Sequence, residues 1–102
     1  MTASTTTPAR FAHEADARRY TMRIGHDLVA VVDYSVNGDA ISFTRTFTSP
    51  PHRGNGYAAQ LVKFAVDDVE SSSTRHIIPM CWYVSDWFEL NTDRKLLLAP
   101  RA

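Results

Sequence analysis

The stretch from Pro50 to Ala59, PPHRGNGYAA, constrains the fold of this 102-residue chain more than any other feature. Two closely spaced glycines, Gly54 and Gly56, lie here between a strand-like run and a helix-like run. Glycine adopts backbone conformations that other residues avoid, and the first amide groups of a helix have no partner within it. These amides and the helix dipole favour a bound anion. The stretch therefore predicts either a loop that binds a phosphate or pyrophosphate, or a strand-to-helix turn that needs glycine only for its geometry.

The residues before this loop have the patterns of β-strands. Apolar and polar side chains alternate from Arg19 to Ile24, which predicts a half-buried strand. A β-branched run follows over Leu28–Val36, and the dipeptide Asn37-Gly38 is a strong hairpin signal before a further strand over Ala40–Thr48. Three antiparallel strands are therefore expected to lead into the loop.

Strict alternation in the last of these strands assigns its side chains to two faces. One face is expected to carry Ile41, Phe43, Arg45 and Phe47. The other face is expected to carry Ser42, Thr44 and Thr46. Two prolines then end the strand, because proline cannot donate a backbone hydrogen bond to a neighbouring strand.

The residues after the loop predict a helix that packs one face on the sheet. Its apolar positions, at helical spacing, are Ala58, Leu61, Val62, Ala65 and Val69. A loop over Ser71–Thr74 separates this helix from a short apolar strand over Arg75–Cys81. A strand that is reached through a crossover helix is normally parallel to its neighbour, and Pro79 places this one near an edge or a bulge.

The last part of the chain predicts a short helix over Tyr83–Leu90 and a final turn over Arg94–Leu98. The sequence thus indicates one α/β (α+β) domain over residues 11–98: three antiparallel strands, a helix, a parallel strand and a C-terminal helix. Residues 1–10, rich in Ser and Thr, are expected to form a disordered leader, and residues 99–102 a tail.

Composition limits the classes of partner. The 11 basic and 11 acidic residues balance, which gives no bulk reason to expect nucleic acid or a membrane as partner. The single cysteine, Cys81, cannot form an internal disulfide, and the four histidines lack metal-ligand spacing. We therefore expect a soluble, cytoplasmic protein without a metal site. The oligomeric state stays open.

Several motifs, in chain order, resemble the GCN5-related N-acetyltransferase (GNAT) family. Arg53-x-x-Gly56-x-Ala58 resembles the pyrophosphate-binding signature of this family. The small N-acetyltransferase domain-containing type of the family is resembled over residues 11–98 by Asp33-Tyr34, Phe43-Thr44-x-Thr46, Arg53-Gly54-x-Gly56 and Pro79-x-Cys81-Trp82-Tyr83-Val84. The resemblance implies a minimal GNAT fold, acetyl-CoA (coenzyme A) as cofactor, and acetyl transfer to an unidentified amine.

The resemblance also implies where the cofactor binds. Its pantetheine arm would lie between the strands 40–48 and 75–81, and its phosphates would lie at the glycine loop. The cofactor-binding residues implied in this way are Thr46, Phe47, Thr48, His52, Arg53, Gly54, Asn55, Gly56, Tyr57 and Ala58. Arg45 is a further candidate partner for a phosphate, or a solvated strand residue.

Cys81 and Tyr83 are the candidate catalytic residues. Cys81 would lie near the thioester and just before a helix start, which lowers the pKa of a thiol. It can accept the acetyl group covalently, shape the pocket or donate a proton, or only pack as a buried thiol. Tyr83 is the candidate that protonates the departing thiolate, and packing within the helix is its alternative role.

The sequence departs from the family at two places. Family members often have His-Thr-Glu-Val before the prolines, where this chain has Arg45-Thr46-Phe47-Thr48, and His-Pro-Glu-Tyr after the last helix, where it has Asn91-Thr92-Asp93-Arg94. The resemblance therefore supplies no His or Glu as general base. Two alternatives stay open: a non-catalytic acyl-CoA-binding module, and a partner-binding domain that uses Trp82, Trp87 and Phe88 without any ligand.

Overall fold

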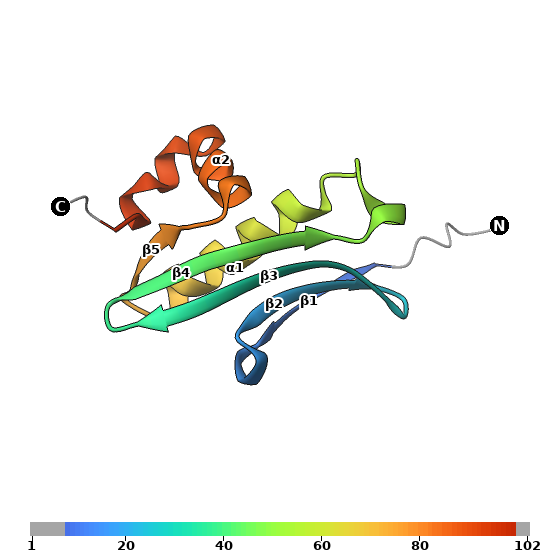
Figure 1. Ribbon diagram of the computed structural model, residues 1–102, viewed down its shortest axis with the longest axis horizontal. Helices are drawn as coiled ribbons and strands as arrows, with labels where there is room; N and C mark the ends of the chain where they lie inside the picture. Colours follow the sequence, from blue (N-terminus) through green and yellow to red (C-terminus); the bar gives the residue numbers. More distant parts are fainter. Residues whose placement is uncertain (1–7, 100–102) are drawn as a thin grey trace.

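The computed structural model of the protein describes residues 8–99, in which one five-stranded sheet contains every strand (Figure 1). The strands are β1 (Ala9–Glu14), β2 (Arg19–Ile24), β3 (Asp27–Asn37), β4 (Ala40–Thr48) and β5 (His76–Pro79), in this spatial order. The first four strands pair antiparallel, and β5 pairs parallel to β4 at the edge of the sheet. The predicted α/β class and the parallel last strand are confirmed.

Two helices and three short 3-10 segments complete the fold. Helix α1 (Tyr57–Ser72) packs against one face of the sheet, and α2 (Trp82–Leu90) lies beyond β5, next to β4 (Figure 1). The 3-10 segments are η1 (Ala15–Ala17), η2 (Pro50–His52) and η3 (Thr92–Leu97). The predicted helical face of α1 is confirmed, because the helix buries Ala58, Leu61, Val62, Ala65, Val66 and Val69.

The first strand, β1, was not predicted. It begins at Ala9, so the expected disordered leader is wrong for Ala9 and Arg10, and residues 1–7 lie outside the described residues. The strand pairs with β2, and Phe11 stacks on Phe64 of α1 with ring centroids 5.2 Å apart. A contact with a distant helix leaves no local signal in the sequence. In addition, β1 itself alternates poorly between apolar and polar residues, so its own pattern does not predict a strand.

The expected C-terminal tail is also shorter than predicted. The amide of Ala99 donates a hydrogen bond of 2.9 Å to the carbonyl oxygen of Ile77. Ala99 therefore belongs with the ordered domain, and residues 100–102 lie outside the described residues.

A β-bulge at Thr44 corrects the predicted faces of β4. Asp33 lies opposite Arg45, but the next residue, Tyr34, lies opposite Phe43, so Thr44 is an extra residue in β4. Residues that face each other in an antiparallel pair share one side of the sheet. Thr46, opposite the buried Val32, therefore lies on the α1 side together with Ile41 and Phe43, and Phe47 and Arg45 lie on the other side. One additional residue reverses every side chain after it.

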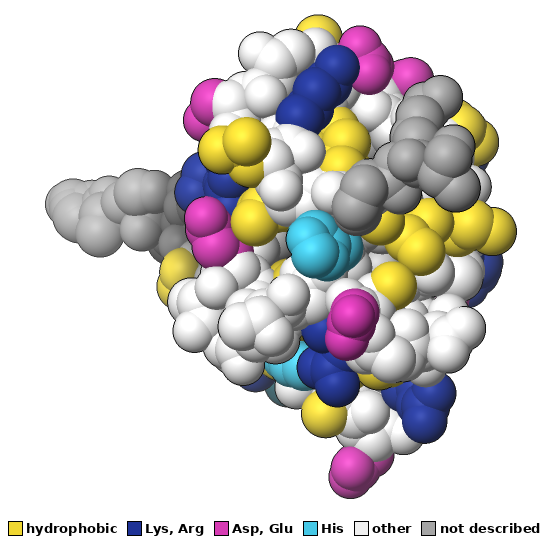
Figure 2. Space-filling model, turned by 90° about the vertical axis from the view of Figure 1, so that its left-hand side faces the viewer, with side chains coloured by type: hydrophobic (Ala, Val, Ile, Leu, Met, Phe, Trp, Pro, Cys, Tyr) yellow, Lys and Arg dark blue, Asp and Glu magenta, His cyan; other side chains and the backbone are white. Residues whose placement is uncertain are grey.

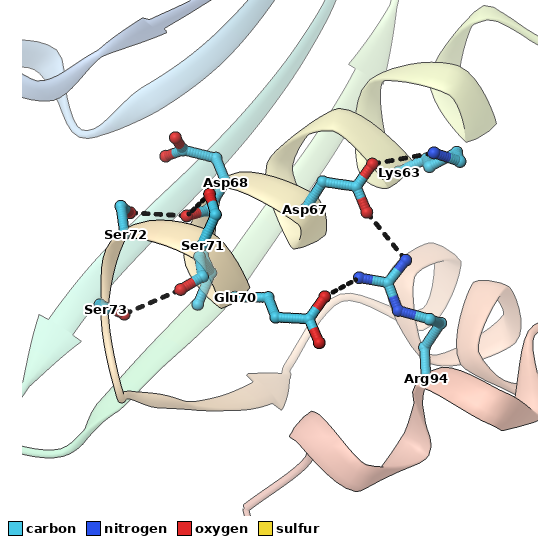
Figure 3. A network of polar contacts seen from close by, with 9 residues as sticks. Lys63, Asp67, Asp68, Glu70, Ser71, Ser72, Ser73 and Arg94 are labelled. Carbon is cyan, nitrogen blue, oxygen red and sulfur yellow. Dashed lines mark hydrogen bonds and ion pairs between the residues drawn. The ribbon is translucent and has the colours of Figure 1, made fainter.

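The last segment, η3, is fastened to α1 by ion pairs. Arg94 donates hydrogen bonds of 2.8 Å to Asp67 Oδ1 and 2.9 Å to Glu70 Oε1, and Asp67 also accepts from Lys63 (Figure 3). The Arg94 side chain is 18% exposed, so its guanidinium is held against the helix. These contacts hold η3 against α1.

The surface carries charges of both signs. On the face shown in Figure 2, basic and acidic side chains are interspersed with uncharged ones. No helix among residues 8–99 has the length and apolar character that crossing a membrane requires.

Candidate functional site

The sheet splits where β4 continues past the end of β5. The two strands pair only from Ala40 to Phe43 of β4, and the amide of Cys81 makes the last link by donating to the Phe43 carbonyl at 3.0 Å. β4 then runs on to Thr48, while the segment after β5 turns away into α2 (Figure 1). The second half of β4 therefore borders an opening instead of a neighbouring strand.

A cavity of about 380 Å³ occupies this opening. Three segments line it: the end of β4, the loop that leads into α1, and the start of α2 with the residue before it. The lining residues are Thr46, Phe47, Thr48, His52, Arg53, Gly54, Gly56, Tyr57, Ala58, Cys81, Trp82 and Tyr83. The glycine loop and the candidate catalytic residues thus share one cavity.

Both glycines of the loop adopt left-handed backbone conformations. Gly54 has φ +85° and Gly56, the N-cap of α1, has φ +74°. This conformation costs other residues about 1–2 kcal/mol. A Cβ atom at either position would meet no atom within 4 Å. Backbone conformation, and not contact within the protein, therefore requires glycine here.

The loop also presents unpaired donors. No side chain caps α1, so the amides of its first residues, Tyr57 and Ala58, have no partner within the helix. Within residues 8–99, no acceptor receives a hydrogen bond from the amides of Gly54 or Gly56. Together with the helix dipole, these donors make the loop suited to an anion.

Two side chains hold the loop in shape. Arg53 Nε donates to the Thr48 carbonyl at 3.2 Å, and Asn55 Nδ2 donates to the His52 carbonyl at 3.0 Å. Asn55, expected to bind the cofactor, does not line the cavity and instead braces the loop. His52 does line it, with Nε2 3.5 Å from Asp27 Oδ2.

Cys81 is the N-cap of α2, and its thiol lies 3.5 Å from the Thr46 hydroxyl oxygen. Burial raises the pKa of the Cys81 thiol, but hydrogen bonds from the Thr46 hydroxyl and from the Tyr83 and Val84 amides outweigh burial, so the net pKa is lowered. Burial raises the pKa of Tyr83, which is therefore a neutral phenol at neutral pH. The site thus combines an acidified thiol with a protonated phenol.

The structure brings together every predicted site residue except Asn55. What these residues bind stays a prediction. Arg45 does not line the cavity: it pairs with Asp33 at 3.3 Å and lies over the Phe47 ring. Trp82 lines the cavity but was not predicted as a site residue. Its position between Cys81 and Tyr83 was the available signal, and its 73% exposure places it at the rim.

The comparisons with known proteins give the family of a chain whose sheet splits beside a glycine-capped helix. The family model described as GCN5-related N-acetyl-transferase matches residues 19–97, and the chain therefore belongs to this family. The solved structures include a similar fold, the ribosomal-protein-alanine N-acetyltransferase from Brucella melitensis biovar Abortus 2308. The two have a TM-score of 0.52 and 19% sequence identity, over 82% of this chain and 62% of that one.

At this identity the likeness to the Brucella protein concerns the fold alone. This chain spans less than two thirds of that protein's length. The comparison with curated proteins gave no match.

Proposed function

We propose that the protein binds acetyl-CoA in the cavity between β4 and α2 and transfers the acetyl group to an amine. The observation that supports this best is the single cavity that joins the glycine loop at α1 to Cys81 and Tyr83 at α2. Membership of the acetyltransferase family adds support from outside the geometry.

The cofactor would be held mainly by backbone groups. Its phosphates would accept hydrogen bonds from the amides of Gly54, Gly56 and the first turn of α1, with Arg53 and His52 beside them. The pantetheine amides would pair with the free edge of β4 at Thr46–Thr48, where β5 no longer supplies a partner. This arrangement would direct the thioester toward Cys81.

Transfer requires a route for the leaving thiolate and for the acetyl group. Tyr83, as a neutral phenol, is suited to protonating the CoA thiolate as the carbon–sulfur bond breaks. Two roles are open for Cys81. Its thiolate can attack the acetyl carbonyl, form an acetyl-cysteine and release CoA before the amine attacks; alternatively, it can form part of the pocket wall while the amine attacks the cofactor directly.

A second candidate function is an acyl-CoA-binding module without efficient catalysis. It is favoured by the lining of the cavity, which within residues 8–99 contains no carboxylate. A third, a partner-binding domain without ligand, is favoured only by exposed apolar side chains such as Trp82 at 73% and Met80 at 67%. Trp87 and Phe88, which were expected to contribute to such a surface, are instead buried in the core.

Two measurements on the whole chain separate these functions. A ligand at a hundred times its dissociation constant stabilises the folded state by about 2.7 kcal/mol, so acetyl-CoA should raise the melting temperature by several degrees. Release of free CoA thiol with a panel of amines should then accompany binding. No thermal shift at millimolar acetyl-CoA would leave the partner-binding function. A shift without thiol release would leave the binding module.

The variant Cys81→Ala separates the two roles of the thiol. If Cys81 accepts the acetyl group, intact-protein mass spectrometry should show an acetyl adduct on the wild type and none on the variant. Both proteins should still show the thermal shift. The same adduct on Cys81→Ala would exclude the covalent role.

A further inference from the structure

The described residues that line the cavity include no carboxylate that could deprotonate a strongly basic amine, because none of them is Asp or Glu. Five of these residues have titratable side chains: His52, Arg53, Tyr57, Cys81 and Tyr83. The segments 1–7 and 100–102 contain no Asp, Glu or His either. Neither of these two segments therefore supplies a side-chain carboxylate or imidazole to the cavity.

Each of the five titratable groups is either engaged in another contact or chemically unsuited to act as a base for the amine. The guanidinium of Arg53 donates to the Thr48 carbonyl at 3.2 Å, and Tyr83 is a phenol whose burial opposes ionisation. His52 and Tyr57 belong to the loop side of the cavity, where the phosphates would bind, and His52 lies 3.5 Å from Asp27. The pKa of the Cys81 thiol is lowered, so its ionised form is a weaker base than an ordinary thiolate.

Asp27 of β3 lies 3.5 Å from His52 at the loop side of the cavity, and the other carboxylates of β3 and α2 are directed elsewhere. Asp33 of β3 pairs with Arg45 on the face of the sheet that lies away from α1. Glu89 of α2 pairs with Lys95 at 3.0 Å. Asp86 of α2 is exposed and does not line the cavity.

The proton balance of acetyl transfer then depends on the amine. A neutral amine attacks the acetyl carbonyl, the carbon–sulfur bond breaks, and the proton that nitrogen loses is the one that the departing thiolate gains. The proton balance of this reaction therefore needs no further base. An alkylammonium ion carries one more proton, which must be removed before nitrogen has an electron pair for the attack.

Building on the proposed acetyltransferase function, we propose that the acceptor is an amine with a sizeable neutral fraction near pH 7, either a peptide α-amino group or an arylamine, and not a lysine side chain. A peptide α-amine is roughly one tenth neutral at pH 7, whereas a lysine amine is neutral in about one molecule in a few thousand. The higher nucleophilicity of the lysine amine offsets part of this difference. We therefore expect the α-amine to react at least about tenfold faster in kcat/KM at pH 7.

The test compares two peptides and two small amines with wild-type protein and acetyl-CoA, by CoA thiol release between pH 7 and 9.5. One peptide has a free N-terminus and no lysine; the other has an acetylated N-terminus and a single lysine. The small amines are aniline and benzylamine. They test whether an aromatic ring replaces the peptide, so the two pairs distinguish the two sources of a neutral amine.

The informative quantity is the ratio of lysine-peptide rate to α-amine-peptide rate. Both peptides meet the same acetyl donor, so the titration of Cys81 or Tyr83 cancels in this ratio. With no base in the cavity, the ratio should rise roughly sixfold to eightfold per pH unit between pH 8 and 9.5, because only the free lysine amine reacts and the α-amine is already mostly neutral there. A ratio that stays constant from pH 8 to 9.5, or lysine as the faster acceptor at pH 7, would overturn the proposed acceptor class while leaving acetyl transfer established. Thiol release from none of the four amines would overturn the transfer itself.

Discussion

Thr46 and Cys81 are 35 positions apart and meet because two irregularities coincide. The bulge at Thr44 turns Thr46 toward the side of the sheet on which α1 packs, and β5 ends where Cys81 begins α2. The Thr46 hydroxyl and two amides of α2 then lower the pKa of the Cys81 thiol despite its burial. At the residue scale, a contact of 3.5 Å between these two side chains therefore links β4 to the start of α2 within the candidate site.

Replacing Thr46 should change the reactivity of Cys81 without changing the fold. In Thr46→Val the hydroxyl is lost, so the midpoint of the pH profile for Cys81 alkylation should move to higher pH and the alkylation rate at pH 7 should fall. Thr46→Ser, which keeps the hydroxyl, should stay close to the wild type. Iodoacetamide labelling followed by mass spectrometry measures both. Equal midpoints for the valine and serine variants would show that Thr46 does not act on the thiol.

At the element scale, the β1–β2 pair depends on one carboxylate. Glu14 accepts hydrogen bonds of 2.8 Å from Arg19 Nε and 2.8 Å from Arg23 Nη1, and one of 3.0 Å from the Thr21 hydroxyl. Thr21 is fully buried, so its hydroxyl needs this partner. Hydrogen bonds from Arg23 and then Arg19 lower the pKa of Glu14 from 4.5 to about 2.

This carboxylate makes the stability of the edge strand depend on pH. The contribution is complete above pH 4.5 and is lost as the pH falls toward 2, because the folded state holds the charged form more strongly than the unfolded state does. Glu14→Gln should lower the free energy of unfolding by on the order of 1 kcal/mol at pH 7, since solvent screens these partly exposed groups. Urea unfolding at pH 7 and at pH 2.5 measures the difference. A destabilisation of the same size at both pH values would contradict the role of the charge.

The sequence predicted elements from local patterns and missed features that depend on distant contacts. Asn37-Gly38 and the helical spacing after Ala58 identified the hairpin and α1. β1 was missed because it alternates poorly and because its contact with Phe64 of α1 lies outside any window of adjacent residues. The reversed faces after Thr44 were missed because a bulge is a property of the strand pair, and alternation along one strand does not show it.

At the scale of the whole molecule, the predicted site was a set of separate segments that the fold had to assemble. Because the loop after β4 and the start of α2 converge on the split between β4 and β5, all predicted site residues but one line one cavity. Asn55 was the exception because its short amide reaches the His52 carbonyl of its own loop. The proposed class of acceptor was not predictable from the sequence, since it depends on which charged side chains line the folded cavity.

The proposed binding of the acetyl-CoA phosphates by the glycine loop is tested most directly by calorimetric titration of wild type and Gly56→Pro. Proline removes the amide donor and fixes φ near −65°, whereas Gly56 has φ +74°. Loss of one hydrogen bond to a charged group corresponds to about one to two powers of ten in affinity, before any distortion of the loop.

Gly38→Ala is the matched control for backbone strain. Gly38 also has a positive φ, +59°, and open space around it, but it lies in the β3–β4 hairpin and does not line the cavity. We expect wild type and Gly38→Ala to bind acetyl-CoA with equal affinity, and Gly56→Pro, shown by circular dichroism to be folded, to bind at least about tenfold more weakly. Wild-type affinity in folded Gly56→Pro, or no binding by the wild type at millimolar acetyl-CoA, would contradict the proposed binding.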